Sequence, residues 1–371
     1  MRLLFLFLFS TTCLFSTAQT FTLFIGTYTG SGSKGIYVYK FNANTGKAEW
    51  VSNTDSASNP SYLAVSKNGK YVYAANETGG TIPGQVSSYA FDKATGKLSF
   101  INSQLSGGDH PCYVSVTNNN KWLAVANYSG GSASIYAIDK DGTLEPSTQF
   151  IQDTGSSVNK SRQDKPHVHS AVFSPDERFL FTPDLGTDKV LIYSFNQSSG
   201  EPLKSANPAF AKVPPGNGPR HFTFHPNKKL AYLVEEISGS VSAFRYKNGN
   251  LQFIQRLNTH PKKYRGKIGS ADIHLSPDGK FLYVSNRGDE NTITIFSINA
   301  ATGKMALKGY QSTLGKTPRN FMIDPTGNFL LVANQDTDNI VVFKRNKQTG
   351  LLKSTGEEIK IPRPVCLKMI K

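Results

Sequence analysis

The fold is decided by a stretch of sequence that the chain repeats. NPSYLAV at 59–65 is matched by HPCYVSV at 110–116, and the match continues through the residues that follow each copy. Each copy contains an alternating strand pattern, then a polar turn such as 68–70, then a second apolar strand such as 71–76. Because an internal repeat determines the architecture of a whole chain, this repeat is the first guide to the fold.

Later copies of the repeat begin with similar residues. If the proline of NPS and its equivalents are taken as anchors, the anchors fall at positions 60, 111, 168, 219, 270, 318 and 364, separated by 51, 57, 51, 51, 48 and 46 residues. Four short strands in a repeat of about fifty residues are typical of a propeller blade. Seven anchors therefore predict an all-β fold, a seven-bladed β-propeller with four-stranded blades.

The two ends of the chain each lack part of a blade. Only one strand, Val365 to Ile370, is expected after the last anchor, whereas the strands expected at 21–27 and 35–41 have no first strand before them. We expect the C-terminal strand to pair with the strand containing residues 24–26, because this closes the ring and removes open sheet edges. No segment keeps a 3.6-residue period over a helix length, which excludes a helix bundle or an α/β fold.

Residues 1–18 are interpreted as an export signal. Arg2, the apolar run that follows it and the small residues ending at Ala18 are typical of a signal peptide. A buried first strand is the less favoured alternative, and the residues before Cys13 make a poor lipobox. Residues 19–371 are therefore expected to form one propeller domain of an exported, periplasmic or secreted protein, with no membrane span.

The charge of the chain limits its partners. The formal net charge is +15, which suggests an acidic partner: nucleic acid, an anionic lipid or polymer, or a small anionic substrate. The basic residues are dispersed, and the densest group is PKKYR at 261–265. A solvated basic surface is therefore favoured, and no nucleic-acid partner is expected.

Cysteine usage excludes a disulfide scaffold. Only Cys112 and Cys366 remain after the expected signal, so a zinc cluster of cysteines is excluded as well. The two residues follow anchors that are separated by an intervening blade, too far apart for a bridge. We expect both thiols to be unpaired.

Repeat geometry places a candidate site at one rim of the ring. If the first hairpin of each blade contains no bulge, the residue after the anchor lies beside the residue 17 positions after it. This arrangement pairs Arg220 with Glu236 and places Arg287 on the next blade. The residues 16 positions after the anchors are short polar or acidic residues that most simply form turns: Asn76, Asn127, Asp184, Glu235, Asn286 and Asn334.

Two repeats depart from the average of the others. GPRH at 218–221 lies opposite Glu235 and Glu236, HVH at 167–169 lies on the next blade, and Arg287 adds a second guanidinium. Histidine, arginine and glutamate from three blades make a pocket that can hold an anion and move a proton. The simplest alternative is that Arg220 and Glu236 form only a salt bridge at the rim. A metal held by the two histidines with Asp184 or Glu236 is less favoured, and no metal or other cofactor is expected.

These stretches resemble a known family. GPRHFTFHP at 218–226, VEEI at 234–237 and SNRG at 285–288 resemble the seven-bladed propeller lactonases, which include propeller-type 6-phosphogluconolactonases and fungal carboxymuconate lactonizing enzymes. The resemblance covers essentially the whole mature chain. It implies a metal-independent reaction at a lactone, with Arg220, Glu236, Arg287 and His169 or His167 at the positions that the lactonizing branch uses.

The expected function is hydrolysis of a sugar-acid lactone, and the resemblance implies 6-phosphogluconolactone as the substrate. Glu236 is expected to act as general base or proton shuttle, Arg220 and Arg287 to hold the anionic group and the developing oxyanion, and His169 to protonate the leaving alkoxide. The expected substrate-binding set is His167, His221, Glu235, Asn127, Asp184 and Asn286.

Two alternatives use the same rim. A non-catalytic propeller could bind an anionic glycan or a protein partner there, because the fold alone does not determine function. A lactonizing or isomerising enzyme would run the reverse chemistry with the same residues. The sequence leaves the oligomeric state open.

Overall fold

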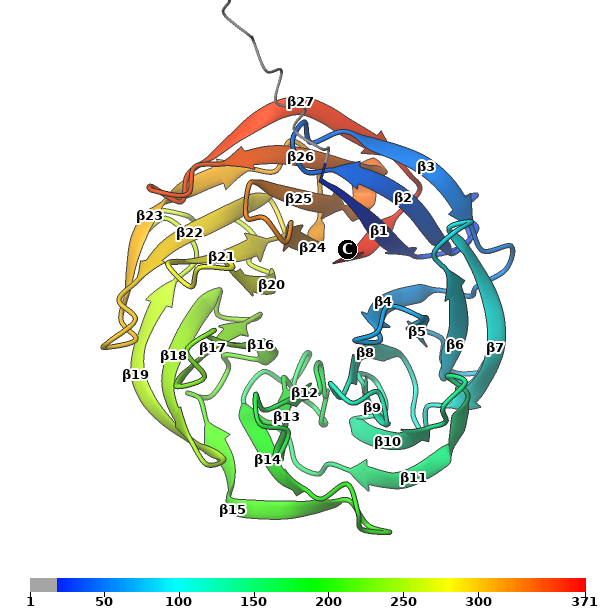
Figure 1. Ribbon diagram of the computed structural model, residues 1–371. Coiled ribbons are helices and arrows are strands. Elements are labelled where there is room, and N and C mark those ends of the chain that lie inside the picture. Colours follow the sequence, from blue (N-terminus) through cyan, green and yellow to red (C-terminus); the bar gives the residue numbers. More distant parts are fainter. Residues whose placement is uncertain (1–18) are drawn as a thin grey trace, which may run out of the picture.

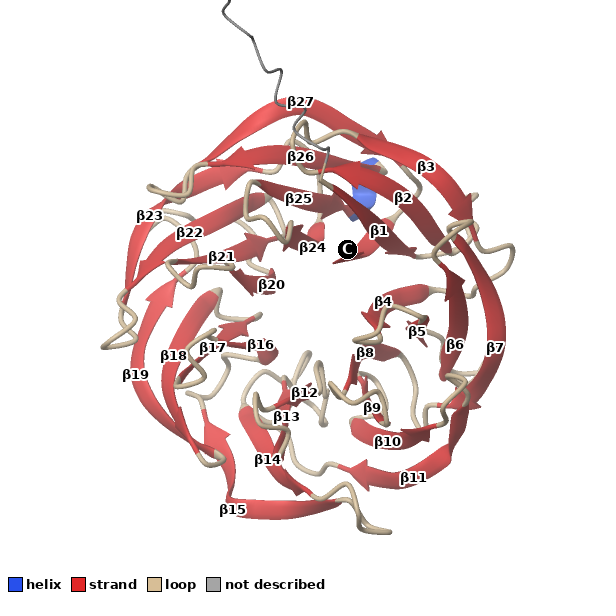
Figure 2. Ribbon diagram, viewed as in Figure 1, coloured by secondary structure: helices blue, strands red, loops and turns tan. Residues whose placement is uncertain are grey.

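The computed structural model describes residues 19–371, so the expected export signal lies outside the described residues. Residues 19–371 form seven four-stranded antiparallel sheets arranged as blades around a central axis (Figure 1). Nearly all of the regular structure is strand, and the only helix in the described part is a short 3-10 helix, η1 (Gln335–Thr337) (Figure 2). The predicted seven-bladed β-propeller is confirmed.

The blades are numbered in the order in which their innermost strands occur in the chain, and the strands of each blade are given from the innermost outward. Blade 1 contains β4 (Pro60–Val65), β5 (Tyr71–Asn76), β6 (Gln85–Asp92) and β7 (Lys97–Leu105). Blade 2 contains β8 (Pro111–Val116), β9 (Trp122–Asn127), β10 (Ser132–Ile138) and β11 (Leu144–Gln152). Blade 3 contains β12 (Val172–Phe173), β13 (Phe179–Asp184), β14 (Lys189–Phe195) and β15 (Leu203–Lys212). Blade 4 contains β16 (Pro219–Phe224), β17 (Leu230–Glu235), β18 (Ser240–Lys247) and β19 (Asn250–Asn258). Blade 5 contains β20 (Ser270–Leu275), β21 (Phe281–Asn286), β22 (Thr292–Ile298) and β23 (Met305–Ser312). Blade 6 contains β24 (Pro318–Ile323), β25 (Phe329–Asn334), β26 (Asn339–Arg345) and β27 (Leu352–Lys360). Blade 7 contains β28 (Pro364–Ile370), β1 (Thr20–Thr27), β2 (Ile36–Asn42) and β3 (Ala48–Asn53).

The hydrophobic core lies between neighbouring blades. Alternation along each strand places apolar side chains on the faces that meet the next sheet. Between blades 3 and 4, for example, the rings of Phe181 and Phe222 stack with centroids 5.4 Å apart. Because every blade packs on two others in this way, the ring holds the inner ends of all seven blades in fixed relative positions.

The two ends of the chain complete one blade together. β28 pairs with β1 in antiparallel fashion, with Leu367 opposite Ile25 and Cys366 opposite Gly26. This is the pairing that the sequence predicted. Blade 7 therefore has four strands like the other blades, and the ring is closed by hydrogen bonds between residues more than 300 positions apart.

Both cysteines in the described residues are free thiols and buried, as expected. Cys112 lies on blade 2 and Cys366 on blade 7, with blade 1 between them. The Sγ atom of Cys366 accepts a hydrogen bond from the N–H of Leu63 at 3.2 Å, so this side chain helps to join blades 7 and 1.

Each inner hairpin contains one extra residue that the expected register lacks. In blade 4, Pro219 lies opposite Glu235, but Phe222 lies opposite Leu233, so β16 carries a bulge between these two pairs. The register shifts at the same place in blades 1, 2, 5 and 6. Blade 3 shows the same step, because its inner strand is reduced to an isolated bridge, followed by β12.

The observed register differs from the expected one, and the bulge affects which side chains reach the site. Glu236 does not lie beside Arg220 in the strand register, since its N–H donates to the carbonyl of Gly218 at 2.7 Å. Consecutive residues of a regular strand point to opposite faces, whereas a bulge re-aims them. Arg220 and His221 therefore line the same small axial cavity, to which five blades contribute.

Candidate active site

The side chain of Glu236 is the centre of a cluster of guanidinium groups near the propeller axis. Glu236 follows β17 directly, and its carboxylate is almost completely buried. Its Oε2 atom lies 2.9 Å from Nε of Arg220 and 3.0 Å from Nη2 of Arg287, and its Oε1 atom accepts from Nη2 of Arg162 at 2.6 Å. The contact with Arg220 is an ion pair without the alignment of a hydrogen bond. Three arginine side chains thus contact one carboxylate: Arg220 from blade 4, Arg287 from blade 5 and Arg162 from the linker between blades 2 and 3.

The arginines determine the protonation state of Glu236. Burial alone raises the pKa of this carboxyl, but Arg287, Arg220 and Arg162 outweigh burial and lower its pKa to about 2. Glu236 is therefore ionised at any pH at which the protein would be assayed. One negative charge against three positive charges leaves an excess of positive charge at the cluster, which favours an anionic ligand or a developing oxyanion.

His169 is the histidine that lies beside Glu236. Its Nε2 atom is 3.9 Å from Oε2 of Glu236, and its Nδ1 atom is 3.5 Å from Sγ of Cys112. Burial, together with the charge of Arg220, holds the pKa of His169 well below its usual range, so the ring is neutral at neutral pH. A neutral imidazole has one N–H and one bare nitrogen, which is the combination needed to pass a proton on.

His167 lies farther from the carboxylate. Its ring stacks on Tyr128 with centroids 4.6 Å apart, and its Nδ1 atom is 3.0 Å from the carbonyl oxygen of Tyr128. Its Nε2 atom lies 3.5 Å from Oδ1 of Asp164. Of the two histidines that the sequence left open, the structure places His169 against Glu236 and His167 against the backbone of blade 2.

Four of the expected site residues are not brought to the cluster. Glu235 is completely buried, and its carboxylate accepts from Ser240, Ser242 and Arg256 on its own blade, and from Asn217. The other three are Asn127, Asp184 and Asn286, whose side chains bond backbone and hydroxyl groups around the ends of their own strands. Each of these four residues is the last residue of its strand. Their contacts fit the alternative reading of this position as turn-forming.

Arg162 is a member of the cluster that sequence reasoning missed. It lies in the linker between β11 and β12, and its Nη2 atom also donates to the hydroxyl of Tyr128 at 3.2 Å. With a side chain 43% exposed, it is the most accessible of the three cations. The only available signal was the spacing of 57 residues between the anchors at 111 and 168, which indicates an insertion at this rim.

A second, partly buried ion pair lies near the axis. Nη2 of Arg319 is 3.2 Å from Oε2 of Glu77, which also accepts from the hydroxyl of Tyr28 at 2.8 Å. Neither Arg319 nor Glu77 is among the site residues expected from the sequence. Because this carboxylate is shared between a cation and a phenol, blades 1, 6 and 7 are joined at the axis.

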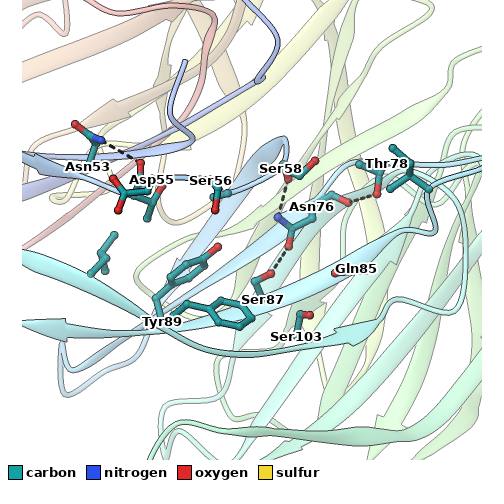
Figure 3. A pocket seen from close by; sticks show the side chains of 15 residues that line it. Asn53, Asp55, Ser56, Ser58, Asn76, Thr78, Gln85, Ser87, Tyr89 and Ser103 are labelled. Carbon is teal, nitrogen blue, oxygen red and sulfur yellow. Dashed lines mark hydrogen bonds between the residues drawn. The ribbon is translucent and has the colours of Figure 1, made fainter. Parts of the chain in front are cut away.

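A wider groove lies elsewhere. It has a volume of about 470 Å³, opens to solvent between blades 7 and 1, and is lined by Asp55, Gln85 and Tyr89 among others (Figure 3). Asn76 and Thr78 also line this groove, whereas Glu77 between them is paired with Arg319. The groove contains neither an arginine nor a histidine, so the side chains suited to acid–base and oxyanion chemistry lie at the axis instead.

Within residues 19–371, no group of three or more His, Cys, Asp or Glu side chains is arranged to hold a metal ion. Across the same residues, none of the helical structure is long and apolar enough to span a bilayer.

Comparison with known proteins gives consistent matches over almost the full chain. Residues 22–369 match the family model described as "Lactonase, 7-bladed beta-propeller". A protein of Formosa agariphila named 6-phosphogluconolactonase is 42% identical over 349 residues, which are 94% of this chain and 99% of that protein. A Bacillus subtilis protein of the same name is 36% identical, over 94% of this chain and 97% of that protein. The structure of a periplasmic gluconolactonase from Pseudomonas aeruginosa has a TM-score of 0.90 and 37% identity, covering 95% of this chain and 99% of that one.

Proposed function

Because the chain belongs to the seven-bladed β-propeller lactonase family, we propose that it opens a sugar-acid lactone at the arginine cluster, with 6-phosphogluconolactone as substrate. Two relatives that share more than a third of its residues carry the name 6-phosphogluconolactonase. The observation that carries the proposal is the convergence of Arg162, Arg220 and Arg287 on one buried carboxylate beside the neutral His169. This arrangement provides anion binding and proton transfer in one place.

The guanidinium groups supply the electrostatic part of the reaction. Water adds to the lactone carbonyl, and negative charge develops on the carbonyl oxygen. Arg220 and Arg287 stabilise that oxygen, because fixed cations in a buried site act strongly on charge that appears only in the transition state. Arg162, at the exposed edge of the cluster, is placed to hold the anionic substituent of the sugar acid.

Glu236 keeps the arginine side chains in position, and His169 transfers a proton. The carboxylate of Glu236 holds the three guanidinium groups together, and its low pKa of about 2 keeps it ionised in this role. His169 passes a proton to the ring oxygen as the carbon–oxygen bond breaks. The side chain of His169 is fixed for this role between Glu236 and Cys112.

We also propose that the protein is exported. The interpretation of residues 1–18 as a signal peptide supports this, and the similar Pseudomonas aeruginosa structure is that of a periplasmic gluconolactonase. The same neighbour favours a second candidate substrate, the unphosphorylated gluconolactone.

Acid release distinguishes the two substrates. Lactone opening produces a carboxylic acid, so a pH-indicator assay on the purified protein follows the reaction with 6-phosphogluconolactone and with gluconolactone, each corrected for spontaneous hydrolysis. We expect a clear enzymatic rate with a larger kcat/KM for the phosphorylated lactone, because the cluster carries excess positive charge. A larger value for the unphosphorylated lactone selects the second candidate. No rate above spontaneous hydrolysis with either lactone contradicts the proposed function.

A further inference from the structure

A buried histidine–aspartate pair lies next to the arginine cluster. Nδ1 of His221, on β16, is 2.8 Å from Oδ1 of Asp272 on β20. Oδ2 of Asp272 is 2.8 Å from Nε2 of His274 and also accepts from the side-chain amide of Asn320. The N–H of Ile273 donates to Oδ1 as well. Since the carboxylate can only accept, Nδ1 of His221 is the nitrogen that carries the proton.

The other nitrogen of His221 has no partner. Its Nε2 atom is buried and unbonded within the described residues, and the same is true of the hydroxyl of Ser61. Both residues line the small axial cavity, together with Cys112, Arg220 and Arg319. Buried polar atoms are nearly always hydrogen-bonded, so an exception calls for a functional or solvent explanation. The cavity has room for about one water molecule, which can donate to Nε2 and accept from the cations around it.

The position of the pair relates it to the proposed site. The rings of His221 and His169 have centroids 5.3 Å apart, and Nη1 of Arg220 is 3.4 Å from Nδ1 of His221. The cavity therefore lies directly beside the residues that bind the substrate in the proposed function. The bulge in β16 is what allows Arg220 and His221, neighbours in sequence, to reach it together.

We propose that His221, oriented by Asp272, is the general base that takes a proton from a water molecule in the axial cavity as that water attacks the lactone carbonyl. This inference rests on the proposed function. One oxygen–carbon bond forms, the proton of the water moves to Nε2, and the carbonyl oxygen becomes an oxyanion beside Arg220. When the ring carbon–oxygen bond breaks, the proton on His221 passes to the ring oxygen by way of His169. One water is consumed, and one hydroxy acid is formed.

His221 is better suited to this step than Glu236. Taking up a proton at the buried carboxylate of Glu236 weakens its ion pairs with three arginines, whereas Nε2 of His221 gives up no partner. Burial and the charge of Arg220 lower the pKa of His221 to about 3, which keeps Nε2 unprotonated at neutral pH. An oxyanion that develops beside Arg220 offsets that charge and raises the proton affinity of His221 during the reaction.

The test compares two histidine variants in the acid-release assay. His221→Gln keeps a side chain of similar size but has no basic nitrogen, so kcat should fall by about 100-fold or more while KM changes less than about threefold. His225→Gln is the matched control. His225 is a buried histidine on the same blade, but its ring contacts the carbonyl of Gly279 and the N–H of Asn227, away from the axis. This variant should keep the wild-type kcat.

A measurement on the wild-type protein covers the case in which His221→Gln does not fold. Long-range proton–nitrogen NMR of histidine-labelled protein at neutral pH, assigned by elimination with single variants of the other histidines, should show His221 with Nδ1 protonated and Nε2 bare. A proton on Nε2 overturns the inference. So does a folded His221→Gln protein that keeps more than half of the wild-type kcat, and in that case the proposed function still stands. A wild-type protein without lactonase activity overturns both.

Discussion

We expect Glu236→Gln to lower kcat/KM of the lactonase reaction by about 10²- to 10³-fold. Glutamine has nearly the same size, but it removes the negative charge that holds Arg162, Arg220 and Arg287 together. The three guanidinium groups then repel one another and lose the arrangement that stabilises the oxyanion. The measurement is the acid-release assay, with a thermal melt to show that the variant is folded.

Gln335→Ala is the matched control for this variant. Gln335 occupies the equivalent position on blade 6, immediately after β25, and its side chain bonds only the neighbouring Asp336. It should leave the rate unchanged. If Glu236→Gln keeps the wild-type rate in a folded protein, the arginine cluster is not the catalytic site.

Deletion of residues 362–371 should destabilise the whole ring. The deletion removes β28, whose buried Cys366 and Leu367 pair with β1, and it exposes the inner edge of blade 7. We expect a loss of several kcal/mol, comparable with the roughly 5–15 kcal/mol net stability of a folded domain. Thermal or denaturant unfolding of the truncated protein measures this loss.

Removal of Lys371 alone is the control, because this residue follows β28 and should leave the melting temperature unchanged. A protein truncated at 361 that melts cooperatively at the wild-type temperature contradicts the closure of the ring by its two ends.

Most of the fold could be read from the sequence because each blade repeats the same local pattern. The anchors at 60, 111, 219, 270, 318 and 364 are the first residues of β4, β8, β16, β20, β24 and β28. Strand alternation and glycine-containing turns are properties of short segments, and a repeat displays them several times. Blade 3 fits less well: its anchor at 168 makes only an isolated bridge, and β12 has two residues.

The site could be predicted only in part. The sequence brought together Arg220, Glu236, Arg287 and His169, because their positions follow from the repeat. Arg162 could not be assigned, since the course of an insertion between two blades is not fixed by any repeat. The bulge in the inner strands has no clear sequence signal. The repeat pattern therefore could not predict that Arg220 and His221 face the same cavity.

The position of Glu235 shows the same limit. It is adjacent to Glu236 and has the same charge, so composition cannot separate the two. Only the direction of the side chain distinguishes them: Glu235 points into its own blade toward Arg256, and Glu236 points to the axis. The direction of a side chain at the end of a strand depends on the register of that strand, and a shift of one residue reverses it.

The most direct test of the account is a crystal structure of the wild-type protein with 6-phosphogluconate, the product of the proposed reaction. The account predicts that the product carboxylate lies within hydrogen-bonding distance of Arg220 or Arg287 and beside His169, with the phosphate near Arg162. A product molecule in the groove between blades 7 and 1, or anywhere that leaves these arginines without contact to it, would contradict the account.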